Sequence, residues 1–232
     1  SRAAPRLLLD LSARDAEWAG QGIAGLSGRL DLGLSPDDPF EIRLDGTRLV
    51  VGDLIWDSLS VRGAGRIPDH RLALTLTGAP ISVTFEGSGG LARDGAYSGR
   101  IARLDLDTAA FGAWALRQPS PVSLAGPKIA FGPFCVRGPS GAGGCAELNR
   151  STADRAVASL DFALPDLALL SPLLPDNLDL TGNARVSGRF DLAGAVLPDD
   201  PEGGSRVVSM IRNSPDPATA AVRSRACCFQ RC

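Results

Sequence analysis

Two aspartates and a histidine are the side chains whose types and spacing come nearest to a catalytic arrangement. Asp105 and Asp107 stand two positions apart, and paired carboxylates can act as acid and base on a glycosidic bond. On a β-strand, however, residues two apart share a face, and charges at such positions are typical of a solvated sheet face. His70 lies in a Pro-Asp-His-Arg segment that predicts a surface turn, and no clear nucleophile accompanies it. The sequence therefore predicts no catalytic residues and no enzyme activity.

A glycine-rich segment at residues 87–92 matches the pattern GxGxxA, which is found in dinucleotide-binding sites. Such a site needs a helix directly after the glycines, because the helix N-terminus holds the pyrophosphate. Residues 93–99 contain two glycines and are not expected to form a stable helix, so we expect no nucleotide. The sequence has no CxxC pair and His70 is its single histidine, so we also expect no metal and no cofactor.

Cys135 and Cys145 flank a glycine-rich turn at residues 138–144, and a hairpin there would place both side chains on one face. In an oxidising compartment we favour a disulfide between them, with a stabilisation of about 2 to 3 kcal/mol from the short closed loop. Two free thiols are the alternative, because spacing alone does not fix the geometry of a bridge. Cys227, Cys228 and Cys232 crowd the last residues and form no zinc pattern.

Alternation of apolar and polar residues is the main structural signal, and it is clearest at residues 177–194. Apolar residues of that stretch share one parity and charged or polar residues share the other, which predicts a strand with one apolar and one wet face. The same pattern recurs through the chain, with turns about ten residues apart, as in an antiparallel meander. A weak repeat supports this, because residues 26–32 (Leu-Ser-Gly-Arg-Leu-Asp-Leu) are echoed by residues 186–192 (Val-Ser-Gly-Arg-Phe-Asp-Leu).

Local turn and helix signals give the expected connections. Asp45-Gly46 predicts a hairpin turn, and residues 87–95 predict a glycine-rich connection. Residues 165–172 are the one credible helical piece, with Asp166 as its cap. We therefore predict an all-β fold: a long, curved antiparallel β-sheet of repeated short strands with an open, β-taco-like groove and one short helix near residues 166–173.

Length, charge and hydropathy limit the domain organisation and the partners. Among the 232 residues, we expect 1–198 to form one repetitive groove domain and 199–232 to be a linker and a divergent, disordered tail. A helix at residues 217–226 is the alternative for the tail. The longest apolar run, 167–174, is too short to span a membrane, and the net charge of -2 gives no reason to expect nucleic acid. The chain begins with Ser, so we expect it to be a piece of a longer protein.

The apolar side chains of the alternating segments are the candidate binding residues. Since no amphipathic helix longer than two turns is present to cover them, we expect them to line a groove for phospholipid acyl chains. The predicted lining residues are Leu30, Leu32, Leu72, Leu74, Leu76, Ile81, Val83, Phe85, Leu180, Val186, Phe190 and Leu192.

Four segments of the sequence resemble the TamB family: residues 97–107, 114–119, 162–175 and 180–192. TamB proteins are similar to AsmA-type proteins, and the resemblance implies a long curled sheet with an apolar lining. It also implies phospholipid transport between the two bacterial membranes and support of outer-membrane protein assembly or translocation. The expected location is the periplasm, with an inner-membrane anchor in a segment absent from this sequence. A TamA-like outer-membrane protein would be a partner of the full-length protein alone.

Two other readings of the same pattern stay open. A structural or chaperone module would bind unfolded outer-membrane proteins by adding their strands to its sheet edges. A closed β-sandwich would cover its two apolar faces with each other and have no groove.

Overall fold

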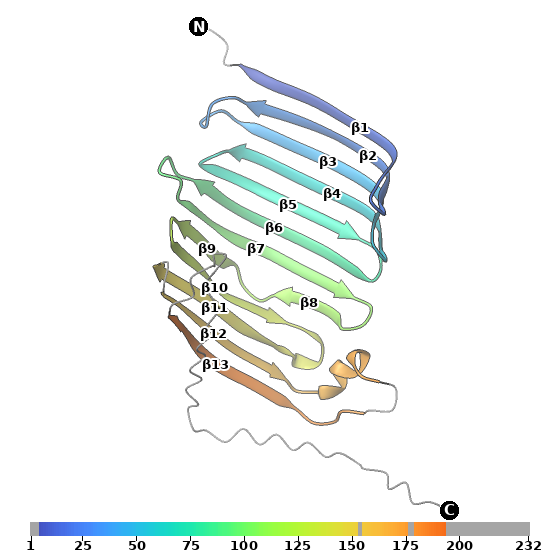
Figure 1. Cartoon of the computed structure of the whole chain (residues 1–232), viewed down its shortest axis with the longest axis vertical. Coiled ribbons are helices and arrows are strands. Elements are labelled where there is room, and N and C mark those ends of the chain that lie inside the picture. The colour runs from blue at the N-terminus through green and yellow to red at the C-terminus, as the bar shows by residue number, and fades with distance from the viewer. Residues whose placement is uncertain (1–4, 153–154, 176–178, 194–232) are drawn as a thin grey trace, which may run out of the picture.

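A computed structural model describes residues 5–152, 155–175 and 179–193, which form one antiparallel sheet of 13 strands (Figure 1). The prediction of an all-β fold with a long curved sheet is confirmed. Among the described residues, no helix has both the length and the apolar character needed to cross a membrane.

The strands are 5 to 13 residues long, and two short 3-10 helices, η1 and η2, accompany them. Their bounds are β1 Arg6–Trp18, β2 Gln21–Gly33, β3 Phe40–Val51, β4 Leu54–Arg66, β5 Asp69–Thr77, β6 Ile81–Leu91, β7 Tyr97–Thr108, β8 Gly112–Leu116, β9 Ser120–Ala125, β10 Lys128–Arg137, η1 Pro139–Gly141, β11 Gly143–Thr152, β12 Arg155–Leu164, η2 Leu167–Leu173 and β13 Ala184–Ala193.

The order of strands in the sheet follows the order in the chain, apart from one shared position. From β1 to β7 each strand pairs with the next, and the same holds from β10 to β13. Between these two groups, β8 pairs with the second half of β7 and β9 with its first half, so β8 and β9 together occupy one strand position (Figure 1). The two are interrupted at residues 117–119, where Pro119 has no amide hydrogen for a ladder bond.

The register places apolar residues opposite apolar residues and polar opposite polar. Leu44, Val61, Leu74 and Phe85 stand directly opposite one another across β3, β4, β5 and β6. Their sequence neighbours point to the other side of the sheet, since side chains alternate along a strand. We call the side that carries Leu44, Val61, Leu74 and Phe85 the apolar face, and the opposite side the polar face.

No second layer covers the apolar face within the part of the chain that the structure describes. A two-layer domain would bury its apolar residues between the layers. Here the buried hydrophobic side chains are Trp56, Cys135 and Ala142. Most of the apolar residues on the strands are instead half-buried by their neighbours in the same sheet. The alternative of a closed β-sandwich is therefore wrong.

Two predicted connections are parts of strands. β3 runs straight through Asp45-Gly46, because Gly46 pairs on one side with Leu26 and on the other with Leu59. The turn falls instead at Gly52. Likewise, the first glycines of residues 87–95 extend β6 as far as Leu91, because the ladders of β5 and β7 continue along them. In both cases long-range pairing outweighs the local turn preference of glycine.

The predicted short helix is confirmed, and its cap is as expected. Asp166 accepts a hydrogen bond from the Ala168 amide at 2.9 Å, and η2 follows as a 3-10 helix at the β12–β13 connection (Figure 1). The strand predicted from residue 177 begins later, at Ala184. Leu178, as well as the predicted tail at residues 199–232, lies outside the described residues.

The connection between β5 and β6 depends on Gly78, which has φ +145° and packs against the backbone of β4. A β-carbon there would lie 2.7 Å from the Trp56 Cα and 2.8 Å from the Asp57 nitrogen. We expect Gly78→Ala to lower the free energy of unfolding by about 3 kcal/mol, through backbone strain and this overlap. Chemical denaturation followed by circular dichroism measures it.

Gly52→Ala is the matched control for that substitution. Gly52 has φ +59°, and a β-carbon there would meet nothing within 4 Å. The expected loss is therefore smaller, about 1 kcal/mol, from the left-handed backbone alone. Equal losses in the two variants would contradict the packing that we assign to Gly78.

Candidate functional site

The apolar face is the candidate functional site, and the structure brings most of the predicted lining residues together on it. Leu74 pairs with Phe85 and Leu76 with Val83, so these residues of β5 and β6 form one continuous patch. On this face also lie Leu30, Leu32, Leu72 and Ile81, with Val186 and Phe190 at the far end of the sheet.

One predicted lining residue is placed differently. Leu180 lies outside the strands, in the segment between η2 and β13. Leu192 lies in β13 with its Cα opposite that of Ala156, which is as much as the structure describes of it. The patch is therefore built by strand residues, from β1 to at least Phe190.

The apolar face is open to solvent. Leu72 in the middle of the sheet is 40% exposed, and Val186 and Phe190 in β13 are 57% and 45% exposed. Exposed apolar residues are ordinary when they are scattered, but a contiguous patch marks a surface that binds something. Here they stand in register across neighbouring strands, so they form such a patch.

Aromatic residues near β10 extend the patch beyond the lining residues that the sequence predicts. Phe131 and Phe134 stack with ring centroids 5.3 Å apart, and Trp114 of β8 stacks on Phe162 of β12 at 6.0 Å. One of these residues could have been predicted from the sequence, because Phe162 follows the alternation of apolar residues along its own strand. The contact between Trp114 and Phe162 could not be predicted from the sequence, because it joins strands that are not adjacent in the chain.

The weak sequence repeat has a structural meaning on this face. A β-carbon at Gly28 would lie 2.3 Å from the Leu44 Cδ2, and one at Gly188 would lie 3.2 Å from the Phe190 ring. Each glycine thus leaves room for an apolar side chain beside it. The repeated Ser-Gly-Arg motif therefore keeps its glycine on the apolar face and its arginine on the polar one.

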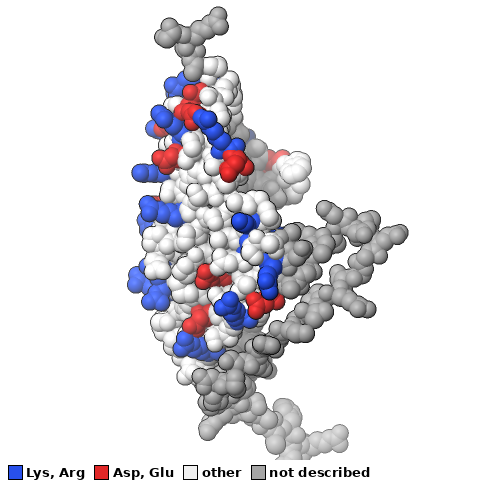
Figure 2. Space-filling view, turned by 90° about the vertical axis from the view of Figure 1, so that its left-hand side faces the viewer, with Lys and Arg blue, Asp and Glu red and all other residues white. Residues whose placement is uncertain are grey.

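The polar face carries ladders of arginines and acids. Figure 2 shows basic side chains projecting in a column along one margin of the sheet, seen nearly edge-on. Arg29, Arg43 and Arg62 are directly opposite one another on β2, β3 and β4, an arrangement that repels. Glu41 and Asp45 offset it, since Glu41 pairs with Arg43 and Asp45 with Arg62.

A shallow hollow of about 1040 Å³ lies over these ladders, bordered by four arginines and four acids. In it, Arg62 donates two hydrogen bonds from Nη2 to the Asp45 carboxylate, at 2.6 and 2.9 Å. These bonds lower the pKa of Asp45 below its usual range. Because the charges balance in number, the hollow has no net preference for an anion or a cation.

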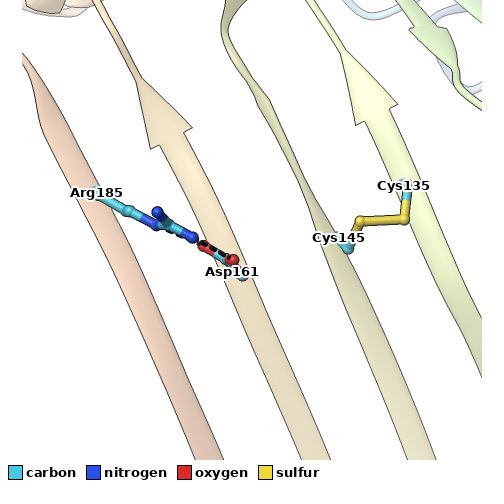
Figure 3. Close-up of a disulfide and its surroundings, with 4 residues drawn as sticks. All are labelled: Cys135, Cys145, Asp161 and Arg185. Atoms are coloured by element: carbon cyan, nitrogen blue, oxygen red, sulfur yellow. Dashed lines mark hydrogen bonds and ion pairs between the residues drawn. A yellow bond between two sulfur atoms is a disulfide. The ribbon is translucent and has the colours of Figure 1, made fainter.

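Cys135 and Cys145 are joined by a disulfide on the polar face (Figure 3). They are directly opposite on β10 and β11, with Cα atoms 4.0 Å apart. The free-thiol alternative does not describe this structure. The bridge ties β10 to β11 next to the position where the two short strands β8 and β9 interrupt the regular pairing.

Asp161 and Arg185 link the last two strands on the same face (Figure 3). Arg185 of β13 donates to both carboxylate oxygens of Asp161 in β12, at 3.0 and 2.8 Å. The hydrogen bonds from Arg185 lower the pKa of Asp161 and raise that of Arg185. The pair therefore favours the pairing of β12 with β13 while the carboxyl is ionised.

Acidification is expected to remove this link. Since the pKa of folded Asp161 is lowered, its contribution to stability is present above the ordinary value of 3.8 and is lost as pH falls through the folded value. We expect Asp161→Asn to lower the melting temperature by about 1–2 °C at neutral pH and by less at about pH 3. Thermal unfolding at both pH values measures this, and a pH-independent difference would contradict it.

His70 lies on the opposite face of the sheet from Asp105 and Asp107 of β7. The prediction that His70 lies in a surface turn is wrong. His70 lies in β5 on the apolar face, directly opposite Gly65 and Gly89. Asp105 accepts a hydrogen bond from Arg103 at 2.5 Å on the polar face, which is the solvated face expected for it. No three His, Cys, Asp or Glu side chains within residues 5–152, 155–175 and 179–193 are grouped as metal ligands.

Comparison with known proteins agrees with these features. A family model described as TamB, N-terminal domain, matches residues 1–199. No curated protein and no solved structure matches the chain. The match includes the four segments that resemble the family in sequence, and it extends over β1 to β6 as well. Since it covers most of the 232 residues, the chain belongs to the TamB family.

Proposed function

We propose that the apolar face carries phospholipid acyl chains, as a groove segment of a TamB-like protein that conducts phospholipid between the inner and outer membranes. The observation that supports this is the open, continuous apolar patch on a sheet that no second layer covers among the described residues. Leu72, Leu74 and Leu76 on β5 continue into Val83 and Phe85 on β6, and Leu72 is 40% exposed. Covering a patch of this kind with hydrocarbon lowers the free energy, because apolar surface is removed from water.

The energetics favour hydrocarbon as the occupant. Each buried CH₂ is worth about 0.8 kcal/mol, so a chain of roughly 16 carbons gains on the order of 13 kcal/mol before ordering costs. The polar groups of the apolar face are few, so a bound chain could slide from strand to strand. We propose accordingly that the protein performs no enzymatic step and needs no cofactor.

Membership of the TamB family supports a place in the cell envelope. We propose the periplasm, with anchoring to the inner membrane and contact with a TamA-like outer-membrane protein supplied by other parts of the full-length protein. Support of outer-membrane protein assembly or translocation belongs to the same proposal.

A second candidate function is strand addition to an unfolded outer-membrane protein. It is favoured by β1, which pairs with β2 alone among the described strands and so leaves one edge of backbone groups free. An extended segment could add to that edge through main-chain hydrogen bonds. This reading needs the edge of the sheet and not its apolar face.

Native mass spectrometry of the purified chain tests the proposal. We expect mass additions of phospholipid that persist after gentle removal of detergent, at about one or a few lipids per chain. A chain that carries no lipid after exposure to vesicles of bacterial phospholipid would contradict it. Crosslinking from Leu8 in β1 to an unfolded barrel protein, without bound lipid, would favour strand addition instead.

A further inference from the structure

Phe40, His70 and Tyr97 form a row of three rings on the apolar face. They begin or nearly begin β3, β5 and β7, at the left-hand edge of the sheet in Figure 1. The ring centroid of His70 lies 6.2 Å from that of Phe40 and 5.9 Å from that of Tyr97. All three side chains are half-buried. The row is therefore an aromatic rim at one end of an aliphatic surface.

Glycines on the intervening strands leave room for the rings. His70 stands between Gly65 of β4 and Gly89 of β6. The Tyr97 hydroxyl lies across Gly89, where a β-carbon would be 2.3 Å from it. The Tyr97 hydroxyl therefore lies over the residue of β6 that is directly opposite His70.

The hydrogen bonds of His70 define which ring nitrogen is free. Its Nδ1 lies 3.1 Å from the Ile67 carbonyl oxygen, which also accepts from the Leu91 amide at 3.0 Å. A carbonyl oxygen can only accept, so Nδ1 carries the hydrogen, and Nε2 of the neutral ring is an acceptor. Among the described residues, neither Nε2 nor the Tyr97 hydroxyl has a hydrogen-bond partner.

We propose that this rim binds the primary ammonium headgroup of a zwitterionic phospholipid, with its acyl chains on the adjacent leucines. This rests on the lipid groove proposed above. The ammonium donates a hydrogen bond to the His70 Nε2, with the rings of Phe40 and Tyr97 on either side of the histidine, and aromatic rings attract cations. The Tyr97 hydroxyl donates to the headgroup phosphate. A rim without a net charge suits a zwitterion better than an anionic headgroup.

The length of β5 fits this arrangement. His70, Leu72, Leu74 and Leu76 share the apolar face, and six residues of strand span about 20 Å. One leaflet of a bilayer holds its acyl chains in about 15 Å, half of the hydrocarbon core. A lipid with its headgroup at His70 can therefore lie with its tails along the strand.

Competition between headgroups tests the proposal on the whole 232-residue chain. The chain is exposed to vesicles of dioleoyl phosphatidylethanolamine and dioleoyl phosphatidylglycerol in equal amounts, and native mass spectrometry measures the bound ratio. We expect a several-fold preference for phosphatidylethanolamine and a clearly smaller preference for His70→Phe, which loses the acceptor but keeps a ring that attracts cations. Arg71→Gln, the next residue on the polar face, should keep the wild-type ratio.

A second readout does not depend on long acyl chains. His70 is the single histidine of the sequence, so its ring signals in an NMR spectrum are unambiguous. We expect the ring Cε1–H signal to shift with soluble dihexanoyl phosphatidylethanolamine and to shift several-fold less with dihexanoyl phosphatidylglycerol.

The outcomes separate this proposal from the one on which it rests. Wild-type protein that binds the two headgroups in a ratio of one, or a preference that is unchanged in His70→Phe, overturns the rim and leaves the groove intact. A chain that binds no lipid at all overturns both proposals.

Discussion

Replacing Leu74 by Asp is expected to reduce bound phospholipid at least about 100-fold. Leu74 lies between Val61 and Phe85 in the middle of the apolar face, so an acyl chain that lies along β5 covers it. An ionised carboxylate covered by hydrocarbon loses its hydration, at a cost of several kcal/mol. A loss of about 2.7 kcal/mol already corresponds to a factor of 100 in affinity. Native mass spectrometry of lipid bound at equal lipid concentrations measures the effect.

Thr75→Asp is the matched control, since Thr75 is the next residue of β5 and is exposed on the polar face between Ser60 and Thr84. It should leave lipid binding as it is in the wild type. Val186→Asp is a second test at the other end of the face, where the side chain is 57% exposed and the carboxylate stays hydrated in the free protein. Full lipid loading of both Leu74→Asp and Val186→Asp, with wild-type circular dichroism spectra, would rule out the groove.

Reduction of the disulfide between Cys135 and Cys145 is expected to lower the free energy of unfolding by about 2 to 3 kcal/mol. The bridge closes a loop across ten residues of sequence separation, and the chain-entropy relation gives about this value for such a loop. We expect the midpoint of urea unfolding to fall when reductant is added to the wild type. The region affected first should be β10 and β11, next to the interrupted strand position of β8 and β9.

The variant Cys135→Ser/Cys145→Ser provides the comparison. It should unfold at the midpoint of the reduced wild type, and reductant should leave it unchanged. A wild-type midpoint that does not move, while thiol titration shows that the bridge has opened, would mean that strand pairing alone holds β10 to β11.

The alternation of apolar and polar residues was sufficient to predict the class of fold. It also predicted which side of the sheet the residues of most strands face. Alternation put Leu72, Leu74 and Leu76 on one side and Arg71, Ala73 and Thr75 on the other, and the register of β5 agrees. Asp166 was recognisable as a cap because capping depends on residues that are neighbours in the chain. Alternation along a strand and capping of a helix both depend on residues that are close in the chain, so the local sequence is enough to predict them.

Strand ends and ring clusters were harder to predict. Asp45-Gly46 has a strong turn signal, yet β3 continues through it because two neighbouring strands pair with Gly46. His70 looks like a turn residue in sequence, but it becomes part of a strand because β4 and β6 both extend to it. The number of ladder bonds that a segment forms with distant strands decided these positions, and a short window of sequence does not contain that information.

The sequence by itself determined that this protein is a β structure of the TamB family with one apolar side. The reason is that the alternation of apolar and polar residues and the family's sequence pattern can both be recognised along the chain. The tertiary structure alone decided that a single sheet leaves the apolar side open, and that Phe40, His70 and Tyr97 meet on it. The physical reason is that alternation fixes which residues share a face, whereas the register between strands fixes which of them touch.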